Sequence, residues 1–156
     1  IKMNKIEEIA NNYVESFGEV LPGFKYGFAN LKEFTSKYYF DFVFKQMNGK
    51  IPKEPPIAGG SCGFTIEKKT LKIKNLTYFE LGMLESNEKE LNEIYDKIKN
   101  IKENKSSLSW LKSKFELSSK QLLEIKKTIE NTEFEKETVL EQLNRIIKTT
   151  TNNTHN

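Results

Sequence analysis

Few residues of this chain have side chains suited to chemistry, and they do not form a complete catalytic set. Ser61 lies at the centre of a Gly-x-Ser-x-Gly pattern, next to the only cysteine, Cys62, while the only histidine is His155. In hydrolases this pattern joins a strand to a helix, and a histidine accepts the serine proton. Here the pattern follows two prolines and precedes an expected strand, and His155 lies in a polar tail. We therefore interpret it as a glycine-rich entry into a strand.

Metal and cofactor sites are not indicated either. A single cysteine allows no internal disulfide and no zinc site built on several thiolates. The pair Gly59 and Gly60 lacks the lysine and the following helix of a phosphate-binding loop. We predict no catalytic residue, no metal, no cofactor and a non-enzymatic protein. An enzyme acting through Ser61 or Cys62 is the last of three hypotheses.

Composition and charge restrict the class of protein. The 156 residues suffice for one compact core, and the 25 basic and 22 acidic residues give a net charge of +3. No basic cluster is visible, so the charge pattern does not favour nucleic-acid binding. No apolar stretch approaches the roughly 18 residues of a membrane-spanning helix, and no apolar signal segment precedes the first helix. We expect a soluble cytoplasmic protein that does not enter a membrane.

The period of the apolar residues changes along the chain and predicts its elements. Residues 5–16 show helical spacing, whereas 24–28 and 40–44 alternate with a period of two, which is typical of strands. Residues 63–67 and 71–74 are expected to form a hairpin that shares one face, and 78–81 fit either a strand or a helical turn. Helices are expected from about residue 87, over 108–115, and after residues 118 and 132. Capping boxes are expected at Asn87 with Glu90, Ser118 with Gln121 and Thr132 with Glu135.

This order of helix, strands and helices predicts an α+β fold with a small, mainly antiparallel sheet and a helical C-terminal extension. We divide the chain into an α+β domain over residues 1–84, a helical extension packed on it over 85–148, and a disordered tail over 149–156.

Aromatic side chains outside the expected core are the candidate contacts for a partner. Phe40, Phe42 and Phe44 share one face of their strand and are expected to be core. Aromatic residues left over on an uncovered sheet face would form an exposed patch, as partner surfaces do. The candidate partner-binding residues are Tyr38, Tyr39, Tyr78 and Trp110.

The first half of the chain resembles the YrhB-like immunity-protein family of bacterial toxin systems. The resemblance is carried by residues 6–10, the aromatic strand 39–44, the proline–glycine segment 56–60 and the hairpin 63–70. The chain departs from the family at Lys37–Tyr38, where a Gly-Trp pair is typical, and at Leu71, where a glycine is common. The resemblance implies a non-enzymatic protein that binds and neutralises a cognate toxin.

The first hypothesis is therefore a protein-binding protein whose partner is a protein, with a toxin implied by the resemblance. The alternative is a nucleic-acid-associated protein that uses lysines of the C-terminal helices, although acidic residues are equally frequent there. The apolar stripes of these helices would also allow a homodimer. The lysines in question are Lys112, Lys114, Lys120, Lys126 and Lys127.

Overall fold

The computed structural model describes residues 3–57, 59–99, 105–131, 141 and 145. The chain divides into two compact units, residues 1–85 and 86–156, which we call the sheet unit and the helical unit. The predicted tail over 149–156 and the capping box expected at Thr132 lie outside the described residues. The packing of the helical extension on the α+β domain stays a prediction.

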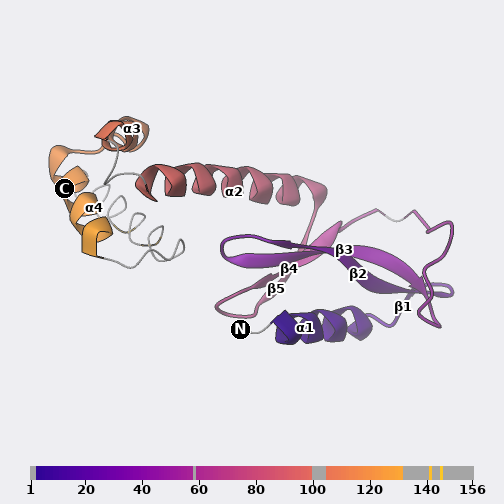
Figure 1. Ribbon diagram of the computed structural model, residues 1–156. Helices are drawn as coiled ribbons and strands as arrows, with labels where there is room; N and C mark the ends of the chain where they lie inside the picture. Colours follow the sequence, from indigo (N-terminus) through magenta and orange to yellow (C-terminus); the bar gives the residue numbers. More distant parts are fainter. Residues whose placement is uncertain (1–2, 58, 100–104, 132–140, 142–144, 146–156) are drawn as a thin grey trace, which may run out of the picture. The chain divides into compact units, whose positions relative to one another are not determined.

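The predicted α+β class is confirmed, with an N-terminal helix, an antiparallel sheet and C-terminal helices (Figure 1). The sheet has the strand order β1-β2-β3-β4-β5, and each neighbouring pair is antiparallel. The sheet unit contains α1 (Met3–Ser16), β1 (Glu19–Leu21), β2 (Phe24–Glu33), β3 (Lys37–Gln46), β4 (Gly63–Glu67) and β5 (Ile73–Leu76). Helix α2 (Tyr78–Lys99) begins in the sheet unit, and α3 (Lys105–Phe115) and α4 (Ser119–Asn131) belong to the helical unit.

Helix α1 covers one face of the sheet, as Figure 1 shows. Its buried residues Ile6, Ala10 and Val14 recur at helical spacing and pack against Phe40 and Phe64 of the sheet. The Phe40 and Phe64 rings stack with centroids 5.3 Å apart. The prediction that Phe40 is core is confirmed, and the expected shared face of the hairpin is confirmed because Leu71 and Ile73 pack on the same cluster as Phe64 and Ile66.

The opposite face of the sheet is also covered, and Tyr39 is 0% exposed there. Tyr39 belongs to a cluster with Phe34, Cys62 and Leu76, against which Leu81 and Leu84 of α2 pack. The expectation that Tyr39 forms part of an exposed patch is therefore wrong. Tyr39 is buried because α2 begins at Tyr78 and not near Asn87. Residues 78–81 therefore form the first turn of this helix.

Strand β2 is longer than its period-two pattern predicts, because a bulge interrupts the pattern. The β2–β3 register shifts between Ala29 and Lys32, and Asn30 has a φ of 53°. Asparagine tolerates this left-handed conformation better than most residues do. The Asn30 side-chain amide donates to a carboxylate oxygen of Asp41 at 3.2 Å. The strand therefore continues to Glu33 with its side chains shifted by one position.

The helical unit has a core of its own. Ile94 and Ile98 of α2 pack with Leu111, Leu117 and Ile125. The predicted capping box at Ser118 is confirmed: the Ser118 N–H donates to Oε1 of Gln121 at 2.8 Å, and the Gln121 N–H donates to the Ser118 hydroxyl oxygen at 3.2 Å. Both bonds satisfy amides that have no partner within helix α4.

Helix α3 ends with a backbone conformation that glutamate disfavours, which gives a first prediction. Glu116 has a φ of 51°, and the Leu117 N–H donates to the Lys112 carbonyl at 3.0 Å, which is the Schellman pattern. Glycine has no penalty at such a φ, so Glu116→Gly is expected to raise the free energy of unfolding of the helical unit by about 1 kcal/mol. Chemical denaturation followed by the fluorescence of Trp110, the only tryptophan, measures this change.

The matched control is Glu116→Ala. It removes the same carboxylate from the helix end but retains the cost of the left-handed conformation. An equal gain in both variants would show that charge, and not backbone conformation, limits the stability of this end.

Candidate functional site

Strand β3 has a neighbour on both sides over only part of its length. β4 pairs with it from Lys37 to Asp41, and the next ladder bond runs from the Phe42 N–H to the Cys62 carbonyl at 3.0 Å. At the far end the Gln46 N–H donates to the Lys50 carbonyl at 2.8 Å. Between these two bonds the chain leaves the edge of β3 as a loop.

The sequence of this loop explains why it does not pair with β3. It contains Pro52, Pro55 and Pro56, which have no N–H to donate to a neighbouring strand. The loop therefore passes along the edge of β3 at a distance and leaves a groove of about 400 Å³. We call this the edge groove; its lining residues are Tyr26, Phe42, Val43, Phe44, Ile51, Pro55, Pro56, Ile57, Gly59, Ser61, Cys62 and Tyr78.

The rim of the edge groove carries large apolar side chains that face solvent. Ile51 is 73% exposed, Tyr78 is 79% exposed and Ile57 is fully exposed. Phe79 and Met83 of α2, one turn apart on the same side of the helix, are also exposed, at 76% and 51%, although they do not line the groove. Single exposed apolar residues are ordinary, but a group of them around a groove is typical of a binding surface.

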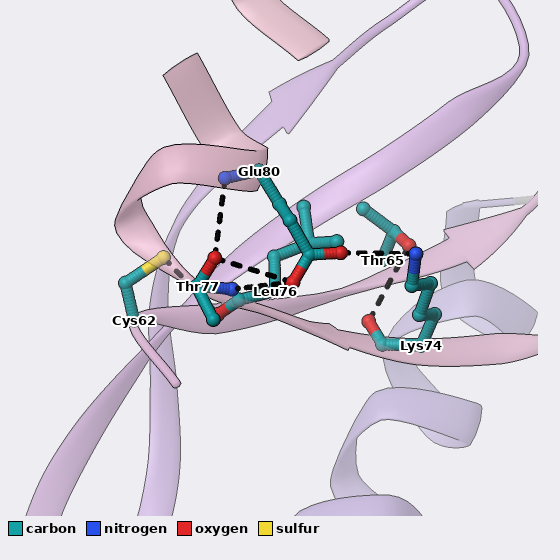
Figure 2. A network of polar contacts seen from close by, with 6 residues as sticks. All are labelled: Cys62, Thr65, Lys74, Leu76, Thr77 and Glu80. Carbon is teal, nitrogen blue, oxygen red and sulfur yellow. Dashed lines mark hydrogen bonds and ion pairs between the residues drawn. The ribbon is translucent and has the colours of Figure 1, made fainter. Parts of the chain in front are cut away.

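The start of α2 fixes the position of Tyr78, and a capping box fixes this start (Figure 2). The Glu80 N–H donates to the Thr77 hydroxyl oxygen, and the Thr77 N–H donates to Oε1 of Glu80, both at 3.2 Å. Lys74 on β5 forms an ion pair with Oε2 of Glu80 at 3.0 Å. The bond from Lys74 and the bonds from Thr77 lower the pKa of the Glu80 carboxyl, so the capping box weakens as pH falls through that pKa.

Cys62 lines the edge groove, but its thiol is held by the core. The Tyr39 hydroxyl donates to Sγ of Cys62 at 3.3 Å, and the thiol donates to the Leu76 carbonyl at 3.4 Å (Figure 2 shows the second bond). Ser61 beside it is exposed. As predicted, the Gly-x-Ser-x-Gly pattern leads into a strand, β4. It does not join a strand to a helix, as it does in hydrolases. His155 lies outside the described residues.

The buried hydroxyl of Tyr39 gives a second prediction. Burial, and next the hydrogen bond to Cys62, raise the pKa of Tyr39 above its ordinary value of 10.0. Above pH 10 the unfolded chain releases this proton while the folded chain retains it, so stability falls as pH rises. The loss approaches about 1.4 kcal/mol per pH unit for this one group, and below pH 10 it is absent.

Tyr39→Phe removes this ionisation and is expected to have a shallower loss of stability between about pH 10 and pH 11.5. Urea unfolding at several alkaline pH values, for the wild type and the variant, measures the two slopes. Equal slopes would show that the Tyr39 hydroxyl does not contribute to alkaline unfolding.

The structure separates the four predicted partner-binding residues. Tyr78 lies at the edge groove, whereas Tyr38 and Tyr39 belong to opposite faces of β3. Tyr38 is half-buried under the ammonium group of Lys68, 5.1 Å from the ring centroid. Trp110 belongs to the helical unit, where it packs against the core. Sequence reasoning missed Ile51 and Ile57, whose only signal is that they are isolated apolar residues between prolines.

Two findings concern the described part of the chain as a whole. Within it, no three histidine, cysteine, aspartate or glutamate side chains are grouped so that they could hold a metal ion. None of its helices combines the length and the apolar character that crossing a membrane requires.

The fold and the edge groove define an α+β protein with an apolar surface site. Comparison of the chain with protein-family models, with curated proteins and with solved structures gave no significant match. The function of the chain is therefore inferred from the chemistry and geometry of the site itself.

Proposed function

We propose that this chain is a non-enzymatic protein-binding protein and that the edge groove, with the exposed residues at its rim, receives an apolar part of a protein partner. The observation that carries this proposal is the group of solvent-facing apolar side chains, Ile51, Ile57 and Tyr78, around a groove of about 400 Å³. Burying such side chains in an interface is favourable in proportion to the apolar area removed from water.

The residue types of the rim and of the first turns of α2 beside it support a protein partner. Tyrosine, phenylalanine and methionine are enriched in the centres of protein interfaces, and aromatic residues often dominate the binding energy. Tyr78, Phe79 and Met83 lie together on the first turns of α2. Helix α2 is held at its start by Glu80 and packs by Leu81 and Leu84 on the sheet, so these side chains are presented from a fixed element.

A bacterial toxin is the partner that the resemblance to YrhB-like immunity proteins implies. The rim lies partly within the resembling half, because Ile51 and Ile57 fall between its aromatic strand and its hairpin. We propose neutralisation of a cognate toxin by direct binding as the form of this function, in which the chain itself performs no reaction.

An affinity capture from the native cell tests the proposed function and gives a third prediction. The double variant Ile57→Ser with Tyr78→Ser is expected to recover at least about tenfold less partner than the wild type, since each side chain is a candidate anchor. Leu123→Ser is the matched control, because Leu123 is a 53% exposed apolar residue of the helical unit. Equal recovery by all three proteins, or loss in the control alone, would place the partner surface elsewhere.

The nucleic-acid alternative is decided by the same experiment. Lys112, Lys120, Lys126 and Lys127 are exposed, but Lys114 forms an ion pair with Glu90 at 3.3 Å. Lys97 and Lys114 both lie over the Trp110 ring, at 5.6 and 5.5 Å from its centroid, where a stacked base would have to bind. Nucleic acid that is retained at low salt and released at moderate salt, without a protein partner, would favour this alternative. The homodimer stays a prediction, to be checked by sedimentation.

A further inference from the structure

The part of β3 that faces the edge groove has backbone groups without partners. In a strand the N–H and C=O of successive residues point to opposite sides, so residues 42, 44 and 46 point to the same side. The Phe42 and Gln46 N–H groups donate to Cys62 and Lys50, which fixes that side as the one facing β4 and the loop. Phe44 lies between them and therefore directs its N–H and C=O into the edge groove.

Neither group of Phe44 has a hydrogen-bond partner within the described part of the chain, and the Phe42 carbonyl has none either. The residue that would complete the ladder at Phe42 is Cys62, but its N–H donates to the Leu76 carbonyl at 2.9 Å. An unpaired strand edge is a template for another strand, because each exposed N–H and C=O gains a hydrogen bond when one is added.

The open edge of β2 is less suited to strand addition. β1 pairs only with Phe24 and Lys25, which leaves the outer side of β2 without a strand from Tyr26 onward. The bulge at Asn30 bends this edge, and Lys32 and Glu33 follow it. Bulges and charged residues are devices that prevent the pairing of edges.

We propose that the edge groove binds a short extended segment of the protein partner, which pairs with Phe44 as an added antiparallel strand in the row of β4. This proposal rests on the proposed function of protein binding and adds the conformation of the bound part. One partner residue exchanges two hydrogen bonds with Phe44, and a neighbouring side chain enters the space between Val43, Ile51 and Ile57.

The charge around the edge groove selects an acidic segment. The loop that borders the edge groove carries two exposed lysines, Lys50 and Lys53, and one acidic residue, Glu54, whereas the Lys45 side chain lies over Gly27 of β2. Neither Lys50 nor Lys53 forms an ion pair within the described residues. Electrostatic complementarity at the rim directs encounter and register, so the bound segment carries an apolar residue flanked by aspartate or glutamate.

The probe for this proposal is a peptide selected from a phage-displayed library of random heptapeptides on the 156-residue chain. Selected sequences are expected to carry a central apolar residue with acidic neighbours. The best peptide is synthesised with blocked ends and then N-methylated at one position at a time. N-methylation at one central position is expected to weaken binding at least tenfold, because it removes the N–H that pairs with the Phe44 carbonyl.

Amide hydrogen exchange followed by NMR gives a readout on the chain itself. In the free protein the Phe44 N–H is expected to exchange at least tenfold faster than those of Phe42 and Gln46, which are bonded. Bound peptide is expected to slow the exchange of Phe44 at least tenfold. Ile57→Ser is expected to lower the affinity of the chain for the peptide, and Leu123→Ser is expected to leave this affinity unchanged.

Two results would overturn the proposal that the partner adds a strand to β3. One is the absence of any enriched peptide. The other is a bound peptide that tolerates every N-methylation and does not slow the amide exchange of Phe44. If the wild type captures a protein partner that the Ile57→Ser and Tyr78→Ser double variant loses, the proposed function stands and only the addition of a strand is wrong. If the capture experiment also fails, the proposed function is wrong as well.

Discussion

Replacing Gly63 with alanine is expected to lower the free energy of unfolding of the sheet unit by about 3 kcal/mol. A Cβ at this position would collide with the carbonyl oxygen of Phe40 and would lie 2.5 Å from the Tyr39 hydroxyl. The Phe40 carbonyl belongs to the β3–β4 ladder and cannot move without breaking it. The Tyr39 ring passes over Gly63 so that its hydroxyl reaches Cys62.

The matched control is Gly59→Ala in the same glycine-rich segment. Nothing lies within 4 Å of a Cβ at Gly59, so its replacement is expected to change stability by less than about 0.5 kcal/mol. Equilibrium unfolding followed by near-ultraviolet circular dichroism of the aromatic residues compares the two variants. A similar loss in both would show that the flexibility of the segment, and not the contact with Tyr39, requires glycine at position 63.

Gly63 also shows how far the sequence predicts the fold. The strand over 63–67 and its apolar face follow from period-two alternation, and the structure has both. The reason for glycine at its first position does not follow from alternation, because it depends on a ring from the neighbouring strand. Local patterns indicate which residues share a face, but they do not indicate what lies opposite that face.

The predicted start of the helix near residue 87 is the error with the largest consequence for the site. The short run Tyr78–Leu81 has no period of its own, so strand and helix were equally compatible with it. The capping residue Thr77 and its partner Glu80 contain the missing signal, because they match the capping-box pattern as well as Asn87 and Glu90 do. Placing the helix start at Tyr78 predicts that Leu81 covers the face of Tyr39.

The edge groove is partly predictable. Tyr78 is a candidate residue from the sequence, and prolines such as Pro55 and Pro56 are incompatible with a central strand because they have no N–H to donate. The groove itself arises because such a loop lies beside the end of β3, beyond the last β3–β4 pair at Asp41 and Gly63. Loop conformation has no periodic signal, so Ile51 and Ile57 are recognised only from the structure.

Phe40→Ala is expected to lower the free energy of unfolding of the sheet unit by about 3–5 kcal/mol. Phe40 is 0% exposed, and its ring contacts those of Phe28 and Phe64 with centroids 4.9 and 5.3 Å apart. Alanine would leave a cavity between α1 and the sheet that backbone hydrogen bonds prevent from closing. Urea unfolding of the variant measures the loss.

Phe79→Ala is the matched change on the surface. Phe79 is 76% exposed, so its removal is expected to alter the free energy of unfolding by less than about 0.5 kcal/mol. If Phe79 belongs to the partner surface, this variant captures less partner although it is as stable as the wild type. Phe40→Ala captures less only at temperatures or urea concentrations at which it unfolds. A Phe79→Ala variant that loses stability as Phe40→Ala does would show that its ring is packed, and Phe79 would then be removed from the proposed partner surface.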